Sequence, residues 1–334
     1  MGRPRWHCAA RLTARQQSSK NTIAASTLST PISSSIPVPG RRFVIGVPFL
    51  WLIVFFFLPF LILVYISFVD MGNDISPFKP LWDSTTGLLK LKYDNYGSIF
   101  RSEGGALFQT LYIEAYLRSL WYALCTAFLC LAVGYPFAYF IARSAPSSRP
   151  ALLMMVMLPF WTSFLLRVYA WKGILGDQGV LNRGLMWLGL TSEPYQMLYT
   201  DVSMLVGMTY VYLPFMVLPL YVNLVKMDFR LLEAAYDLGA SPFKAFWLVT
   251  VPLSRAGIVA GFMLVFIPSV GEFVIPSLLG GPENIMIGRV VWDEMFISNN
   301  WPRASALAVV MIGLIVVPLA VYYHYTGGPA DSAA

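Results

Sequence analysis

The chain has 334 residues, of which 57% are hydrophobic and only 12% are charged, and it carries a formal net charge of +6. A soluble domain carries about 25% charged residues, so this composition excludes a water-exposed globule and indicates a protein that faces lipid. The cysteines and histidines form no zinc spacing, and neither a Gly-rich phosphate loop nor a Ser/His/Asp arrangement can be assembled. The basic residues lie between hydrophobic runs, which is typical of membrane orientation signals and not of nucleic-acid binding. We therefore expect no enzyme, no directly bound cofactor or metal, and no nucleic-acid partner.

Residues 1–42 are basic and rich in Ser and Thr, and they contain no acidic residue. This composition predicts a disordered cytoplasmic tail. Two alternatives stay open: a start codon placed too far upstream, and an organelle transit peptide, which has a similar composition.

Six hydrophobic segments follow, and each is long enough to cross about 30 Å of hydrocarbon as a helix. Helices are expected because the apolar/polar alternation of barrel strands is absent. The sequence therefore predicts an all-α, polytopic membrane domain over 43–325, followed by a short C-terminal tail, 326–334. The expected spans are 43–69, 117–142, 151–172, 203–225, 257–281 and 304–324.

The connections between the spans differ in their basic content. One set holds 13 Lys and Arg residues, and the other holds 7. Because basic segments stay in the cytoplasm, we expect both termini to be cytoplasmic. The cytoplasmic set is 1–42, 143–150 and 226–255, and the outer set is 70–116, 173–202 and 282–303. The long outer segment 70–116 places aromatic residues among polar ones, which favours a folded cap over a flexible linker.

The segment 226–255, between the fourth and fifth spans, begins with apolar residues at helical spacing. Gly239 fits just past the end of this helix, where a left-handed backbone closes it without a Cβ penalty. Ser241 then fits an N-cap, and Pro242 fits the first position of a second helix. We therefore predict two short helices joined by a sharp turn. The apolar residues of the first are Leu231, Ala234, Ala235 and Leu238.

Small residues at Ala234 and Ala235 permit this helix to dock closely into a groove on another protein. Glu233 could then pair with a basic residue in that groove. An amphipathic helix lying in the lipid interface is the alternative. Spacing alone leaves both interpretations open.

The same segment resembles the Glu-Ala-Ala loop of bacterial ABC importer permeases. The matching residues are Glu233-Ala234-Ala235, Gly239 and Val249-Thr250-Val251-Pro252. The family pattern ends Ile-x-Leu-Pro, so Val249 and Val251 are mild departures. The resemblance implies a type I ABC importer permease fold with a helix that sits in the cleft of a cytoplasmic ATPase. It assigns ATPase coupling to Glu233, Ala234, Ala235, Gly239 and Pro252.

A narrower resemblance connects four further segments with the spermidine/putrescine permeases, in the order of their B-type subunit. They are Gly134–Arg143, Leu158–Trp171, Tyr212–Tyr221 and Phe266–Gly281. The resemblance covers about 43–325 and implies polyamine uptake across the bacterial inner membrane. The implied partners are a second homologous permease subunit, two ATPase subunits that use ATP and Mg²⁺, and a periplasmic solute-binding protein. Another small cationic or organic solute is the alternative passenger.

Three residues in the spans are candidates for the substrate path. Glu272 lies deep in the fifth span among helix-breaking Gly and Pro residues, where a carboxylate in a cavity would suit a polycation; a structural partner for a neighbouring Arg or for backbone donors is the alternative. Trp161 and Tyr169 could bind alkylammonium groups by cation–π attraction, or belong to the aromatic belt at the membrane interface. Arg167 and Lys172 would oppose a polycation, so snorkelling or pairing is expected for them.

A stand-alone secondary transporter is the rival class. It predicts inverted repeats and several paired charges inside the membrane. Apart from Glu272 the sequence shows few such charges and no repeat, which favours the ATP-driven importer.

Overall fold

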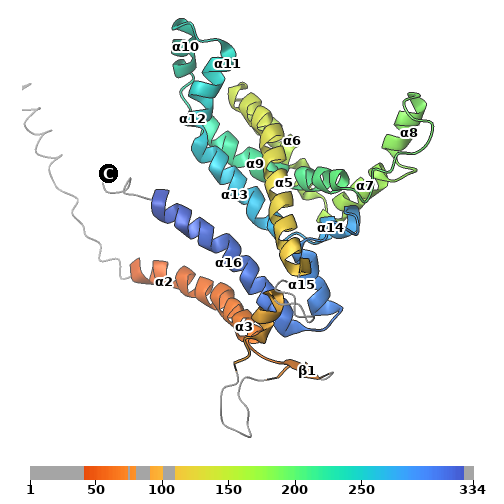
Figure 1. Cartoon of the computed structure of the whole chain (residues 1–334). Helices are drawn as coiled ribbons and strands as arrows, with labels where there is room; N and C mark the ends of the chain where they lie inside the picture. Colours follow the sequence, from red (N-terminus) through yellow and green to blue (C-terminus); the bar gives the residue numbers. More distant parts are fainter. Residues whose placement is uncertain (1–40, 74–75, 80–90, 101–109, 327–334) are drawn as a thin grey trace, which may run out of the picture. The chain divides into compact units, whose positions relative to one another are not determined.

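The computed structural model describes residues 41–73, 76–79, 91–100 and 110–326. The predictions for residues 1–40 and for the last eight residues lie outside this part of the chain. The chain divides into two compact units, residues 1–59 and residues 60–334. Each unit is described by itself (Figure 1).

The described part of the first unit is an apolar helix. It comprises α2 (Arg41–Leu52) and a π-helical segment (Ile53–Phe57), and the chain continues as α3 (Leu58–Ser67). The stretch Ile45–Ser67 has a mean hydropathy of 2.8 and is long enough to span a membrane. Its side chains from 45 to 59 are exposed, as expected of a helix that presents apolar residues to lipid on most sides.

The described part of the outer segment after this span is folded. Strands β1 (Met71–Asn73) and β2 (Ser76–Phe78) form an antiparallel pair in which Met71 lies opposite Phe78. The short helix α4 (Asp94–Phe100) follows. The Asn95 amide donates to the carbonyls of Ser67 and Val69, each at 2.9 Å, and so ties α4 to the end of α3. These residues are folded, as expected, and their position on the outer side stays a prediction. The β-ribbon is a small departure from the all-α prediction.

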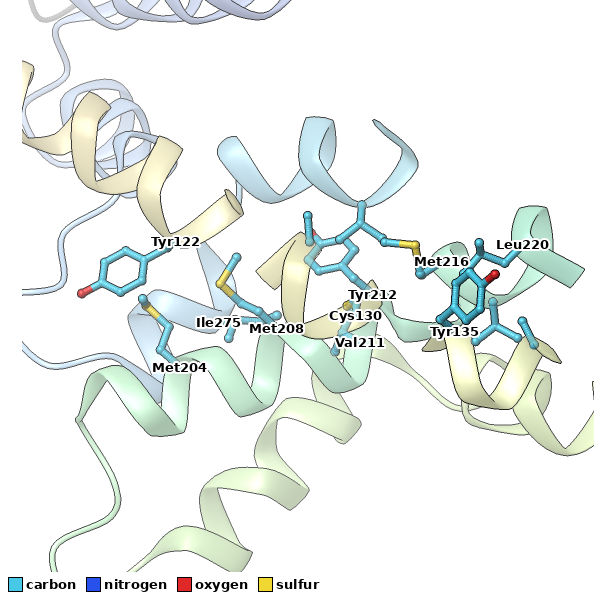
Figure 2. Close-up of a cluster of buried hydrophobic side chains, with 14 of the residues drawn as sticks. Tyr122, Cys130, Tyr135, Met204, Met208, Val211, Tyr212, Met216, Leu220 and Ile275 are labelled. Carbon is cyan, nitrogen blue, oxygen red and sulfur yellow. The ribbon is translucent and has the colours of Figure 1, made fainter. Parts of the chain in front are cut away.

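The centre of the second unit is a bundle of α5 (Thr110–Arg143), α9 (Asp201–Leu224) and α13 (Arg255–Val270). Figure 2 shows its buried cluster, in which α5 and α9 contribute sulfur-containing and aromatic side chains. Small residues bring α13 close to α9: a Cβ on Gly257 would lie 2.7 Å from Asn223 Cβ, and one on Gly261 2.8 Å from Met216 Sδ. Such contacts between small residues are the usual means by which membrane helices associate.

The prediction that the third span, 151–172, is one continuous helix is wrong. The chain forms α6 (Arg149–Met157) with a 3₁₀ turn (Leu158–Trp161), and then α7 (Phe164–Leu175), with a bend of 88° between the two halves. Pro159 lies in the turn, and its carbonyl accepts from both the amide and the hydroxyl of Thr162, at 3.3 and 2.7 Å. These local bonds replace the helical ladder. A further helix, α8 (Val180–Trp187), follows α7.

The expected fifth span, 257–281, is also interrupted. Helix α13 ends at Val270, and the separate short helix α14 (Val274–Leu279) follows a turn. This break confirms the effect expected of the Gly and Pro residues. A bend of 69° near Ser254 lies before this span. The remaining helices are α15 (Ile287–Phe296) and α16 (Trp301–Thr326).

The span count agrees with the sequence. Within the described residues, four helices are long and apolar enough to cross a membrane, or up to six if each bent pair counts as one span. The second, fourth and sixth expected spans correspond to α5, α9 and α16 within a few residues, apart from an extension of α5 at its start.

Candidate functional site

The turn predicted at Gly239 is present with the expected backbone. Helix α10 (Arg230–Asp237) ends at Leu238, and Gly239 has φ = +81°. The amide of Ala240 donates to the carbonyl of Ala235 at 3.0 Å, and the amide of Gly239 donates to that of Tyr236 at 2.9 Å. This pair of bonds is a Schellman motif, which requires the left-handed conformation that glycine adopts without strain.

The start of the next helix is also confirmed. Ser241 is the N-cap of α11 (Pro242–Ala245), and its hydroxyl accepts from the Lys244 amide at 3.4 Å. Pro242 holds the first helical position, where its missing amide is not needed. We call residues Leu238–Pro242, where the chain reverses between α10 and α11, the coupling turn. Figure 1 shows α10 and α11 beyond α12 (Val251–Leu253), which leads into α13.

Most of the surface of α10, and the Leu238 that follows it, faces outward. Leu238 is 89% exposed, Glu233 and Ala234 are exposed, and Ala235 is half-buried. The side chain that anchors the helix is Leu232, which is 4% exposed. The helix therefore presents small and apolar residues on a surface that nothing in the described chain covers.

The anchor beneath the coupling turn continues into the bundle. Ala245 is buried in α11, and a π-helical segment (Phe246–Thr250) leads through α12 (Val251–Leu253), which contains Pro252, to the bend at Ser254. There the hydroxyls of Tyr135 and Ser254 lie 2.8 Å apart, and the Tyr135 ring packs edge-on against Phe246 at 5.4 Å. A displacement of the turn would thus act directly on α5 and α13. Sequence reasoning missed the Tyr135–Ser254 contact, because the two residues are 119 positions apart.

Glu272 lies in the turn between α13 and α14 and is half-buried. One carboxylate oxygen accepts from the Tyr212 hydroxyl at 2.6 Å, and the other accepts from the amides of Val274 and Ile275 at 3.0 and 3.3 Å. The carboxylate thus satisfies backbone donors that the helix break leaves free. This is the bonding expected of the structural alternative, and the path role stays a prediction.

The two aromatic candidates lie on either side of the α6–α7 bend. Trp161 ends the 3₁₀ turn and is 79% exposed, and Tyr169 is exposed on α7. Within the described chain neither hydrogen-bonds to Glu272. The elements that carry them are neighbours, since α7 packs against α14, and a shared role in a substrate path stays a prediction.

A second polar cluster was not found by sequence reasoning. The Tyr122 hydroxyl lies 2.9 Å from Asp201 Oδ1 and 3.1 Å from Asn284 Oδ1, and so joins α5 to the start of α9 and to the segment before α15. Nearby, Ser119 Oγ accepts from the Ile287 amide at 2.7 Å. The only signal in the sequence was polar side chains near the ends of spans. Among the described residues no group of three or more His, Cys, Asp or Glu gathers as a metal site would.

The fold matches that of known ABC importer permeases. A bacterial ABC transporter that imports the acidic polysaccharide alginate is similar with a TM-score of 0.58 at 17% identity, over 87% of this chain and 97% of that chain. The alginate ABC transporter in complex with an alginate pentasaccharide-bound periplasmic protein gives a TM-score of 0.57 at 17% identity. The match covers 85% of this chain and 94% of that chain. The chain is therefore a multi-pass membrane protein with the fold of an ABC importer permease.

Sequence comparison narrows this class. The chain is 37% identical over 285 residues to the spermidine/putrescine transport system permease protein PotB of Haemophilus influenzae, which covers 85% of this chain and 93% of the relative. The Escherichia coli protein of the same name is 37% identical over 274 residues. This match covers 82% of this chain and 93% of the relative. The chain belongs to the PotB family of spermidine/putrescine transport permeases. No family model matches it.

Proposed function

We propose that this chain is the membrane-spanning permease subunit of an ATP-driven importer for polyamines such as spermidine and putrescine. The observation that carries the proposal is its 37% identity, over 85% of its length, to a permease named for that transport. Another small solute is the alternative passenger, because an E. coli protein named only as the inner membrane ABC transporter permease YdcU is also 33% identical, over 64% of this chain and 72% of its own length.

The coupling turn receives the driving force. Glu233 and Ala234 of α10, together with Leu238 of the turn, form an exposed surface. This surface fits a groove on one of two cytoplasmic ATPase subunits, which bind the ATP and Mg²⁺. Movement of the turn passes through the π-helical segment and Pro252 to the bend at Ser254, and from there to α5 and α13. This motion opens the transport path alternately to the two sides of the membrane.

Assembly requires partners on both sides of the membrane. A second, homologous permease subunit completes the path, and a periplasmic binding protein delivers the solute. The alginate transporter supports the latter, since it was crystallised with a periplasmic protein. The basic excess on one set of connections supports cytoplasmic termini in the bacterial inner membrane.

The passenger then meets aromatic and acidic groups. Glu272 supplies a carboxylate for an ammonium group, and its bond to Tyr212 would exchange for one to the passenger. Trp161 and Tyr169 supply exposed rings for cation–π contacts.

Reconstitution of the complete transporter in liposomes tests this function. Radiolabelled spermidine should enter only when ATP, the ATPase subunits and the binding protein are all present. Glu233→Lys should abolish uptake while the protein still inserts, because it replaces the carboxylate that would pair with a basic residue in the ATPase groove. Asp237→Lys, on the same helix and also exposed, is the matched control and should retain uptake. Unchanged uptake with Glu233→Lys would contradict the coupling assignment.

A further inference from the structure

A π-helical segment, Phe246–Thr250, connects the coupling turn with the bend at Ser254. In this segment the amide of Val251 donates to the carbonyl of Phe246, five positions earlier, whereas an α-helical amide donates to the carbonyl four positions earlier. The turn therefore holds one residue more than an α-helical turn would. Single π-helical turns of this kind occur frequently at functional sites, and this one lies where a displacement of the coupling turn would reach α13.

The residue that favours the wide turn is Pro252. In an α-helix a proline ring clashes with the carbonyl four positions earlier, here that of Leu248, and a wider turn relieves this clash. Among the described residues there is one other π-helical segment, Ile53–Phe57. It ends two residues before Pro59, just as Phe246–Thr250 ends two residues before Pro252. The same offset in two separate helices indicates that proline is the cause of the widening.

Thr250 favours the opposite arrangement. Its side chain is fully buried, and its hydroxyl has no hydrogen-bond partner within the described part of the chain. A threonine in an α-helix can donate to the carbonyl four positions earlier, which here belongs to Phe246. In the wide turn the Val251 amide takes this carbonyl, and a buried hydroxyl without a partner is unfavourable. Conversion to an α-helical turn would give the hydroxyl an acceptor.

The surroundings of the segment leave it room to change. The Phe246 ring packs edge-on against Tyr135 and Tyr139 of α5, with ring centroids 5.4 and 6.2 Å apart. An apolar groove of about 360 Å³ lies beside the segment, between α5 and α13. On the segment itself Trp247 is 53% exposed and Leu248 is 73% exposed. Packing within the described residues therefore does not fix this turn on all sides.

We propose that Phe246–Thr250 is a two-state joint, which changes between a π-helical and an α-helical turn as the transporter cycles. The change rotates the coupling turn relative to α13 by about 100° and shifts it by about 1.5 Å along the helix axis, which is the contribution of one residue. The opposed preferences of Pro252 and Thr250 keep the two states close in free energy, as a switching element requires. The inference rests on the proposed function, because it specifies how a displacement of the coupling turn becomes a rotation of α13.

Spin labels on either side of the joint test it in the complete transporter. Phe243→Cys on α11 and Leu264→Cys on α13 replace exposed side chains, in a background with Cys8→Ser and Cys125→Ser. Double electron–electron resonance in liposomes measures the distance between the two labels. We expect this distance to change when a non-hydrolysable ATP analogue is added, because the analogue holds the ATPase subunits in one state.

Substitutions that favour one state test the balance. Pro252→Ala removes the clash and should hold the joint in the α-helical state. Thr250→Val removes the hydroxyl but keeps the shape, and it should hold the π-helical state. The two variants should therefore give different label distances that no longer respond to the analogue, and each should lower spermidine uptake at least about fivefold. Pro59→Ala, at the same offset in the other π-helical segment, is the matched control and should leave uptake unchanged.

The outcomes separate this inference from the proposed function. If the wild-type transporter takes up no polyamine with ATP, its ATPase subunits and the binding protein present, the proposed function fails. If it transports polyamine while the label distance stays constant, only the two-state joint fails. Equal label distances in Pro252→Ala and Thr250→Val would also overturn the joint, because the two substitutions act in opposite directions.

Discussion

Glu272 has a structural role in the fold, and the proposed function gives the same side chain a role in transport. Its carboxylate caps the amides that the break after α13 exposes, and it also accepts from Tyr212. Both interactions hold a charge at a depth where an isolated carboxylate would be unfavourable. The Tyr212 bond can be exchanged for a bond to an ammonium group, whereas the amide bonds are part of the fold.

Glu272→Gln separates these roles. Glutamine keeps an oxygen that can accept from the amides but removes the negative charge. We expect polyamine flux to fall by about tenfold or more, which corresponds to at least ~1.4 kcal/mol, while assembly is retained. Radiolabelled uptake and recovery of the complex measure the two effects.

Tyr212→Phe is the control, because it removes the hydroxyl and leaves the carboxylate. Flux should be largely kept. If Glu272→Gln leaves flux unaltered, the carboxylate is structural and the path assignment fails.

At the scale of the element, the coupling turn combines a fixed shape with an unpartnered surface. Gly239 sets the reversal through its positive φ, and Leu232 and Ala245 anchor the two short helices from below. The exposed face is therefore presented rigidly, which is a requirement for transmitting a displacement. The Tyr135–Ser254 contact connects this rigid unit with the bundle.

Substitutions at Gly239 test the shape. Gly239→Ala should weaken ATP-coupled uptake, since a left-handed backbone costs an alanine about 1–2 kcal/mol. Gly239→Pro should abolish it, because proline fixes φ near −65° and removes the amide that donates to Tyr236. Gly239→Asn should retain most uptake, because asparagine tolerates this conformation.

Gly184→Ala is the matched control in a helix, where a Cβ would meet nothing within 4 Å. Membrane insertion of each variant is measured alongside uptake. Normal uptake with Gly239→Pro would show that the turn does not transmit force.

At the scale of the whole molecule, the described residues form a helical domain, and the proposed function takes the energy for uphill transport from a separate ATPase subunit. This requires the coupling turn to lie in the cytoplasm and α8 to lie outside. The excess of basic residues in 1–42, 143–150 and 226–255 predicts that orientation.

Cysteine labelling in intact cells checks the orientation. Phe243→Cys on the coupling side and Leu188→Cys after α8 replace well-exposed side chains. A membrane-impermeant thiol reagent should modify Leu188→Cys in intact cells and Phe243→Cys only after lysis. A background with Cys8→Ser and Cys125→Ser removes two native thiols, since Cys125 is only half-buried, and the third, Cys130, is buried. The reverse labelling pattern would exclude the proposed topology.

The sequence by itself determined the membrane class, the approximate spans and the coupling turn. These features depend on hydrophobic runs and on local backbone rules, such as the left-handed preference of Gly239 and the capping of Ser241. Their physical causes act over a few residues, so they can be read without the rest of the fold. The family motif added the partner and the passenger as proposals.

The tertiary structure alone decided which distant groups meet. The bond between Glu272 and Tyr212 and the contact between Tyr135 and Ser254 depend on packing between helices far apart in sequence. Periodicity shows that a segment is apolar, but it does not show which polar group lies opposite another. The division of the expected span 151–172 has a local cause. The Thr162 hydroxyl donates to the Pro159 carbonyl, and a count of apolar residues does not detect such a bond.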